Sequence, residues 1–309
     1  MIVNTGCRTD IPAYFGSWLL NRVRQGSVMA RNPYRPELVT RYQLDPQVVD
    51  VMCFCTKNPA PLLPYLGELS AFRQFWFVTA TPYGPDIEPN VPPKDQVLRS
   101  IQQLAAVVGP RDTAWRYDPV LITQRYTVEY HLRAFERMAA RLQGHVAFCV
   151  VSFIDLYEKT RRNFPQARAV TAQEQQLLTA EFARMGAKHG IPIRLCCENA
   201  ALAACGANTD GCMTQDVLER ACNIKLNVPC SKRSARAACN CMLGADIGAY
   251  NTCPHGCAYC YANYDQQVVA RNLRHHDPES PLLIGHLHPG DQVHDANQQS
   301  WLARQLPLF

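Results

Sequence analysis

Short apolar runs and amphipathic stretches alternate through the first two hundred residues of the chain. Apolar runs rich in β-branched residues predict strands, and an apolar face that recurs every three to four residues predicts a helix. Residues 127–143, for example, place Val128, Leu132, Phe135 and Met138 on one helical face. The predicted strands are 2–6, 48–56, 74–81, 113–120, 145–153 and 191–197, and the predicted helices are near 60–72, 94–108, 127–143 and 172–189.

This alternation is typical of a parallel sheet that is covered on both faces. We therefore predict an α/β fold, namely a full or partial (β/α) barrel of about six to seven parallel strands. Residues 1–199 would form the barrel core. Residues 26–46 interrupt the alternation and predict a β-hairpin inserted after the first helix.

The character of the chain changes after the sixth predicted strand. Eight cysteines fall between residues 196 and 241, and residues 200–245 show little periodicity apart from a short helix near 214–222. We interpret 200–245 as a cysteine-rich insertion. Residues 246–309 are expected to belong to the same barrel domain, with a strand at 246–252, a cysteine-bearing loop, a helix from about 260 to 270, and a polar tail at 271–309 packed over the domain.

Composition narrows the function classes. The 309 residues are 47% hydrophobic, and the formal net charge of +5 is spread without a block of Lys and Arg, which favours a solvated surface over a nucleic-acid-binding arm. No apolar run reaches the roughly 18 residues that span a bilayer, and the N-terminus does not have the pattern of a signal peptide. We therefore expect a cytoplasmic protein without a membrane partner. Its 15 cysteines should be reduced there, which favours metal binding or catalysis.

The stretch TCPHGCAYCYANY, residues 252–264, brings Cys253, Cys257 and Cys260 together in a C-x3-C-x2-C spacing. A [4Fe–4S] cluster has four irons and is normally held by four cysteines, so a three-cysteine loop leaves one iron open to a small molecule. Two alternatives remain at this point. One is a zinc site that adds His255 or a distant cysteine, and the other is a set of structural cysteines without metal.

Polar residues follow each of the six predicted strands, where parallel α/β folds place their active sites. We interpret them as the lining of a polar mouth, although each can instead be a helix cap or a turn residue, and Arg116 with Asp118 can be a structural ion pair. The candidate catalytic residues are Asp10, Lys57, Arg116, Asp118, Asp155 and Tyr157, and the candidate cofactor-binding residues include Glu198 and Asn199.

The spacing C-x3-C-x-aromatic-C resembles the signature of the radical S-adenosylmethionine (SAM) superfamily. This resemblance implies a [4Fe–4S] cluster with SAM on its open iron, Tyr259 near the adenine, and one-electron cleavage of SAM to a 5′-deoxyadenosyl radical. The superfamily motif usually follows the first barrel strand, so a permutation is implied in which strand 246–252 lies beside strand 2–6. Arg8 and Asp10 would then occupy the place of the superfamily's Gly-Gly-Glu segment and contact the carboxylate and amino groups of SAM.

More of the chain resembles the family called domain of unknown function 1848, whose members have a C-terminal cysteine cluster similar to that of radical SAM proteins. The resemblance runs through CRTDIPAYFGSWLLNRVRQG, TKNPAPLLPYL, YGPDIEPNVPP, WRYDPVL, YTVEYHLRAFE, SFIDLYEKTRRN and DIGAYNTCPHGCAYCYAN. It also implies a second set of cysteines, Cys197, Cys212, Cys239 and Cys241, which would hold a second iron–sulfur cluster or a structural zinc. Around the cluster the chain resembles spore photoproduct lyase, which raises nucleic acid as a substrate.

We therefore expect a radical SAM-like iron–sulfur enzyme that cleaves SAM reductively and acts on a substrate that the sequence does not specify. Such chemistry needs a low reduction potential, so a ferredoxin- or flavodoxin-type electron donor is the expected partner. Two alternatives belong to other classes: a non-catalytic iron–sulfur sensor of redox state or iron, and a zinc-stapled nucleic-acid-binding protein. The aromatic residues are not interleaved with Lys and Arg, which argues against the last.

Overall fold

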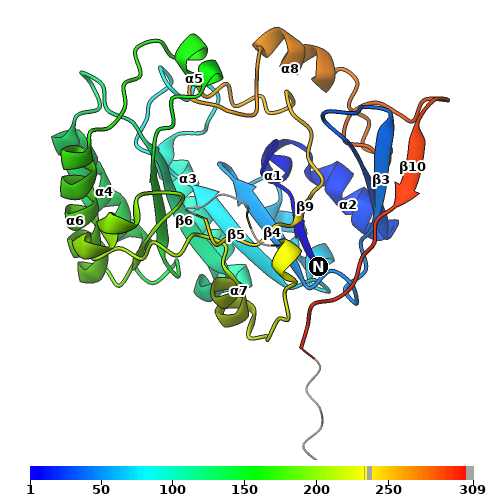
Figure 1. Cartoon of the computed structure of the whole chain (residues 1–309), viewed down its shortest axis with the longest axis horizontal. Coiled ribbons are helices and arrows are strands. Elements are labelled where there is room, and N and C mark those ends of the chain that lie inside the picture. Colours follow the sequence, from blue (N-terminus) through cyan, green and yellow to red (C-terminus); the bar gives the residue numbers. More distant parts are fainter. Residues whose placement is uncertain (233, 235–238, 304–309) are drawn as a thin grey trace, which may run out of the picture.

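The computed structural model describes residues 1–232, 234 and 239–303. Its centre is a seven-stranded sheet in the order β8-β7-β6-β5-β4-β1-β9, in which every pairing is parallel (Figure 1). The α/β class is confirmed, and the sheet is open with β8 and β9 at its edges, so the partial barrel is the form found. The strands are β1 (Ile2–Asn4), β4 (Val51–Thr56), β5 (Gln74–Thr79), β6 (Thr113–Val120), β7 (Cys149–Phe153), β8 (Ile193–Leu195) and β9 (Ala245–Asp246).

The helices predicted at 94–108, 127–143 and 172–189 are present, whereas the one predicted near 60–72 is not an α-helix. Instead of an α-helix at 60–72, the chain forms a 3-10 helix, because Pro59, Pro61 and Pro64 lack the amide hydrogens that an α-helix requires. The α-helices are α1 (Ile11–Tyr14), α2 (Gly16–Arg24), α3 (Lys94–Val108), α4 (Val128–Leu142), α5 (Glu158–Asn163), α6 (Ala172–Lys188), α7 (Gln215–Cys222) and α8 (Gln266–Leu273). The 3-10 helices are η1 (Leu63–Leu69), η2 (Pro110–Asp112), η3 (Ala200–Cys205) and η4 (Cys230–Lys232).

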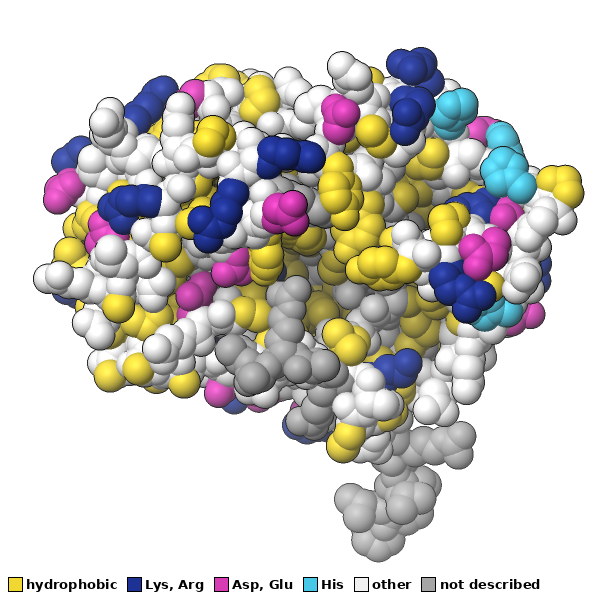
Figure 2. Space-filling model, turned by 45° about the horizontal axis from the view of Figure 1, so that its top comes forward, with side chains coloured by type: hydrophobic (Ala, Val, Ile, Leu, Met, Phe, Trp, Pro, Cys, Tyr) yellow, Lys and Arg dark blue, Asp and Glu magenta, His cyan; other side chains and the backbone are white. Residues whose placement is uncertain are grey.

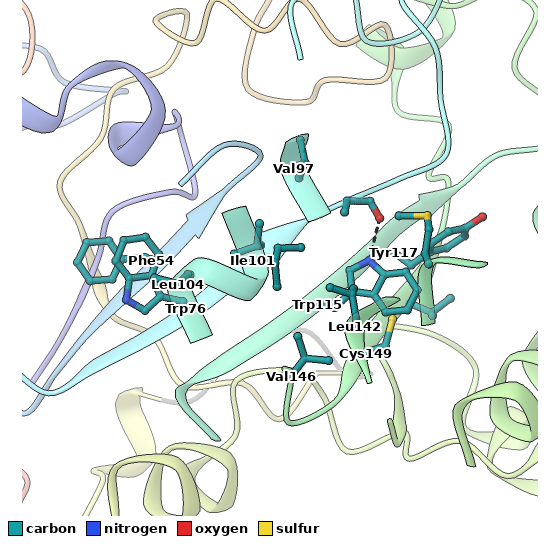
Figure 3. Packing of buried hydrophobic residues seen from close by; sticks show 14 of the residues in the cluster. Phe54, Trp76, Val97, Ile101, Leu104, Trp115, Tyr117, Leu142, Val146 and Cys149 are labelled. Carbon is teal, nitrogen blue, oxygen red and sulfur yellow. Dashed lines mark hydrogen bonds between the residues drawn. The ribbon is translucent and has the colours of Figure 1, made fainter. Parts of the chain in front are cut away.

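One face of the sheet packs against helices α2, α3, α4 and α6. Side chains alternate along a strand, so every second residue of the sheet enters this core. Figure 3 shows Phe54 of β4 stacked on Trp76 of β5, with ring centroids 3.9 Å apart. Trp115 of β6 packs in the same core and donates its indole hydrogen to the Ala80 carbonyl at 2.8 Å. This core fixes the strands whose ends carry the candidate site.

The opposite face of the sheet packs against the cysteine-rich segment rather than against the main helices. Cys53, Phe75 and Phe77 on the strands form a second core with Cys212 and with Leu218 of α7. Both faces are therefore covered, as predicted. The cover on this face is mostly irregular chain with short helices among the described residues.

The predicted hairpin is present as β2 (Ser27–Arg31) and β3 (Leu38–Gln43), which pair in antiparallel fashion. The C-terminal segment does more than pack over the domain, because β10 (Gln292–Asp295) pairs in parallel with β3 and makes a three-stranded sheet. The last six residues of the predicted tail, 304–309, lie outside the described residues. Within the described part of the chain, no helix has the length and apolar character needed to cross a membrane.

The strand that precedes the cysteine motif lies where the permutation requires. Ala245 and Asp246 of β9 pair in parallel with Val3 and Asn4 of β1, which confirms the predicted placement beside strand 2–6. The strand is shorter than the predicted 246–252. The following helix, α8, begins at residue 266 instead of about 260, after Asp265 caps it by accepting a hydrogen bond from the Gln267 amide at 2.8 Å.

Candidate functional site

The segment 252–264, here called the cysteine loop, closes on itself at its base. The Asn251 amide donates to the Ala262 carbonyl at 3.1 Å, and the Asn251 side chain accepts from the Tyr264 amide at 2.5 Å. The Asn263 side chain donates to the Cys253 carbonyl at 2.6 Å. These bonds engage residues 262–264 in the base of the loop, so α8 begins later than predicted.

The cysteine loop rests on the segment that follows β5. Asn90 donates its amide to the His255 carbonyl at 3.1 Å and its side chain to the Pro254 carbonyl at 2.7 Å. Gly256 has φ +70°, and a Cβ there would lie 3.0 Å from the Pro89 side chain. Glycine at this position therefore allows both the turn between two cysteines and the close approach to the sheet.

A buried carboxylate, Glu88, connects the cysteine loop to the strand ends. Only 2% of Glu88 is exposed, and it accepts hydrogen bonds from Thr81 at 2.7 Å, from Lys57 at 2.8 Å, and from Lys94 and the Tyr259 hydroxyl. Burial opposes ionisation, but the charges of Lys57 and Lys94 lower the pKa of Glu88 to about 2. The Lys57 ammonium also lies 5.4 Å from the centroid of the Tyr259 ring.

A second buried pair holds the other side of the loop. Asp10 Oδ2 lies 2.8 Å from His255 Nε2 and accepts the Lys57 amide at 2.7 Å, while Oδ1 accepts the Ala13 amide at 3.1 Å and caps α1. His255 Nδ1 is 2.9 Å from the Tyr14 hydroxyl. Both ring nitrogens of His255 thus have partners in the protein, which weighs against the alternative in which His255 is a zinc ligand.

The three thiols of the loop are partly buried. Removal from water raises the pKa of Cys253 well above its ordinary value and that of Cys257 to about 12, so both are neutral thiols until a cation offsets the charge of the thiolate. Among the described residues, no three Cys, His, Asp or Glu side chains form a ready-made site for a metal ion.

Other predicted residues lie beside this loop. The Arg8 guanidinium, at the end of β1, is 5.5 Å from the centroid of the Tyr250 ring. The Tyr261 hydroxyl donates to the Cys7 carbonyl at 2.5 Å and joins the loop to the same strand end. The structure thus brings Asp10 and Lys57 against the cysteine loop, which contains Tyr259, and places Arg8 beside Tyr250, just before the loop.

A second polar group lies on strands β6 and β7. Arg116 and Asp118 form an ion pair at 2.6 Å, as the structural alternative proposed, and Asp118 also accepts from the Ser152 hydroxyl. Glu198 accepts the Phe153 amide at 2.7 Å, and burial raises the pKa of its carboxyl to about 7. In Figure 2, where the top of the molecule comes forward, hydrophobic side chains gather near the middle of this face with charged side chains around them.

Three further predicted residues, Asp155, Tyr157 and Asn199, lie at the surface after β7 and β8. The Tyr157 hydroxyl donates to Asp155 at 2.9 Å, and both side chains are exposed. The exposed Asn199 accepts the Ala201 amide at 2.9 Å and caps η3, which is the role of an ordinary cap residue. Their predicted catalytic and cofactor-binding roles stay predictions.

Sequence reasoning missed Glu88, Lys94 and Tyr14. Glu88 had a recognisable signal, because it is a carboxylate in a proline-rich segment that closely follows a buried strand. The positioning role of His255 could not be read from the sequence, since its partners Asp10 and Tyr14 are about 240 residues away in the chain.

The second predicted set of cysteines is brought together only in part. Cys212 Sγ lies 3.6 Å from Cys241 Sγ and 3.5 Å from the sulfur of Cys196, which was not in the predicted set. Hydrogen bonds from Cys197 and Cys212 raise the pKa of the Cys196 thiol. Cys239 lies close enough to act electrostatically on Cys241, whose pKa is raised chiefly by its hydrogen bond with Cys212.

Comparison with known proteins gives one match, which is to a family model. No curated protein and no solved structure matches the chain. A family model described as Domain of unknown function (DUF1848) matches residues 2–262, a range that runs from β1 through all three cysteines of the loop. The chain therefore belongs to the DUF1848 family.

Proposed function

We propose that this protein is a radical SAM-like iron–sulfur enzyme in which Cys253, Cys257 and Cys260 bind a [4Fe–4S] cluster. One observation carries the proposal: the three-thiol loop follows β9, the edge strand beside β1, at the carboxyl edge of an open parallel sheet. Read in spatial order from β9, the cluster loop follows the first strand of a partial barrel. This is the arrangement implied by the superfamily resemblance, permuted in the chain.

When bound, a three-cysteine cluster leaves one iron for SAM and supplies the electron that cleaves its sulfonium bond. The residues around the loop have supporting roles in this proposal. Glu88 holds the loop through the hydroxyl of Tyr259, and Asp10 holds the loop's first turn through His255. Both carboxylate oxygens of Asp10 are engaged, Oδ1 by the Ala13 amide and Oδ2 by the Lys57 amide and His255, so we assign it a positioning role and leave Arg8 as the candidate contact for the SAM carboxylate.

The β6–β8 side of the mouth is the proposed place for the substrate. Because its pKa is about 7, the Glu198 carboxyl can hold or release a proton near neutral pH. Arg116 and Asp118 are already paired with each other, and their partly buried ion pair provides a fixed polar surface rather than a free charge. A ferredoxin- or flavodoxin-type protein remains the proposed electron donor.

The test is cleavage of SAM by protein that has been reconstituted and reduced without oxygen. We expect 5′-deoxyadenosine from the wild type and from the control Cys230→Ala, whose thiol is exposed in η4 and outside the loop. Cys257→Ala should lose both iron and product. Protein that holds four irons but forms no 5′-deoxyadenosine would contradict the enzyme and favour a sensor, and protein that binds only zinc would contradict the cluster.

A further inference from the structure

Three thiols from separate parts of the chain meet on the face of the sheet that the main helices do not cover. Cys196 follows β8, Cys212 precedes α7 and Cys241 precedes β9. Their sulfur atoms are 3.5 Å apart for Cys196 and Cys212 and 3.6 Å apart for Cys212 and Cys241. Cys212 and Cys241 are 6% and 9% exposed, so this meeting point is buried.

These distances distinguish between the two kinds of metal centre that thiolates form. Around one tetrahedral ion with metal–sulfur bonds of about 2.3 Å, neighbouring sulfurs are about 3.8 Å apart. On a cubane each thiolate binds a different iron, and the cluster keeps the sulfurs farther apart. The sulfur separations of 3.5 and 3.6 Å are therefore close to those around a single tetrahedral ion. Both short distances share Cys212, so a bound ion would draw Cys196 and Cys241 toward a common centre.

The surroundings favour negative charge on these sulfurs. The Met213 amide donates to Cys241 Sγ at 3.2 Å, and Arg116 Nη1 lies 3.7 Å from Cys212 Sγ. Such donors orient metal-bound thiolates and stabilise their charge. Gly211 has φ +109°, and a Cβ there would lie 3.2 Å from Cys241 Sγ, so the backbone passes close to the sulfur where only glycine fits easily.

A fourth thiol is available from the same segment. Cys239 is partly buried, packs against the second core and lies two residues before Cys241. Neither residue is helical, and side chains two residues apart in non-helical chain can face the same side. Cys197 is the other neighbour, and it hydrogen-bonds to the Cys196 thiol. Because side chains of adjacent residues in extended chain point to opposite sides, we take Cys239 rather than Cys197 as the fourth ligand.

We infer that Cys196, Cys212, Cys239 and Cys241 bind one tetrahedral divalent metal ion, for which four thiolates favour Zn²⁺. Each thiol releases its proton to solvent as it binds, so four protons leave when the ion enters. The ion would fasten the irregular chain that covers this face of the sheet, which has only short helices among its described residues. This inference replaces Cys197 of the predicted set with Cys196, and it does not depend on the proposed SAM chemistry.

Metal analysis of purified full-length protein tests the inference. We expect about one zinc per chain in the wild type, in the control Cys230→Ser and in Cys257→Ala, and at least a tenfold loss of zinc in Cys212→Ser. Zinc retained by Cys212→Ser would overturn the site. Zinc lost from Cys257→Ala would also overturn it, because the ion would then belong to the cysteine loop.

Because Cys212→Ser can fail to fold, X-ray absorption at the zinc edge of the wild type provides a second test. We expect four sulfur ligands at about 2.3 Å and no nitrogen or oxygen. A Cys197→Ser variant should keep this spectrum, whereas Cys239→Ser should replace one sulfur by a lighter ligand or lose the ion. Mixed ligands in the wild type, or iron with sulfide in place of zinc, would overturn the inference.

Discussion

The cysteine loop and the Cys196–Cys212–Cys241 group are built in opposite ways. In the loop, three thiols come from one short segment, and residues outside the loop, above all Asp10 and Glu88, hold it against the strand ends. In the other group, thiols from three distant segments touch one another. The barrel holds the cysteine loop in place, whereas a metal ion bound by the Cys196–Cys212–Cys241 group would hold the surrounding chain in place.

This difference determines what each group needs from the rest of the protein. The loop should keep its place when no metal is bound, because its hydrogen bonds go to carboxylates, amides and carbonyls of the barrel. The cysteine-rich segment packs on the sheet through the second core, and we expect loss of its ion to loosen the irregular chain around the thiols. Variants that disturb the supports of the loop therefore separate the two regions.

The largest effect is expected from Glu88→Ala. Removing this carboxylate leaves Lys57 and Lys94 without their buried partner, which should lower the free energy of unfolding by about 3–5 kcal/mol. Glu68→Ala removes an exposed carboxylate from Arg24 and should cost about 1 kcal/mol or less. Denaturant unfolding compares the two variants. Equal losses would mean that Glu88 does not anchor the loop.

Acid should reproduce part of that loss. The pKa of Glu88 is about 2 in the folded protein, below its ordinary value of 4.5, so its contribution is fully present above about pH 4.5 and disappears as the pH falls through 2. The loss is on the order of 3 kcal/mol. Unfolding measured between pH 6 and pH 2 should show a smaller decrease for Glu88→Gln than for the wild type, and parallel curves would contradict the assignment.

A smaller effect is expected from His255→Ala. The change leaves the buried Asp10 carboxylate without its side-chain partner and should cost about 1–3 kcal/mol. His294→Ala, which removes an exposed ring from β10, serves as the control. We expect His255→Ala to retain less iron while its zinc content stays constant, which would show that the cysteine loop and the Cys196–Cys212–Cys241 group are independent. A parallel loss of zinc would contradict that independence.

The smallest effect is expected from Gly256→Ala. The substitution has two costs: alanine is strained at a positive φ, and its Cβ would lie 3.0 Å from the Pro89 side chain. Gly26→Ala introduces the same strain at φ +68° with nothing within 4 Å, so the difference between the variants isolates the contact with Pro89. We expect Gly256→Ala to be less stable by about 1 kcal/mol more. Equal stabilities would show that the loop does not press on residues 89–90.

The sequence predicted features that depend on local pattern. The order of strands and helices and the hairpin at 26–46 followed from hydrophobic periodicity. The placement of 246–252 beside β1 was implied by the superfamily resemblance, through the permutation of the motif's position in the chain. The 3-10 helix η1 departs from the prediction because periodicity alone does not register the missing amides of three prolines.

Features that depend on tertiary contact were not predictable in this way. Glu88 receives bonds from β4, from the segment after β5, from the start of α3 and from the cysteine loop, and no spacing in the sequence connects these positions. Likewise, the sequence does not show which of the adjacent residues Cys196 and Cys197 contacts Cys212. In the structure, the turn after β8 places the Cys196 sulfur beside that of Cys212.

The most direct test of the central claim is the iron and acid-labile sulfide content of protein purified without oxygen. We predict four irons and four sulfides per chain for the wild type and for Cys230→Ala, and their loss from Cys253→Ala, Cys257→Ala and Cys260→Ala alike. A cluster that survives any one of these three substitutions would contradict the assignment of the cysteine loop as its site.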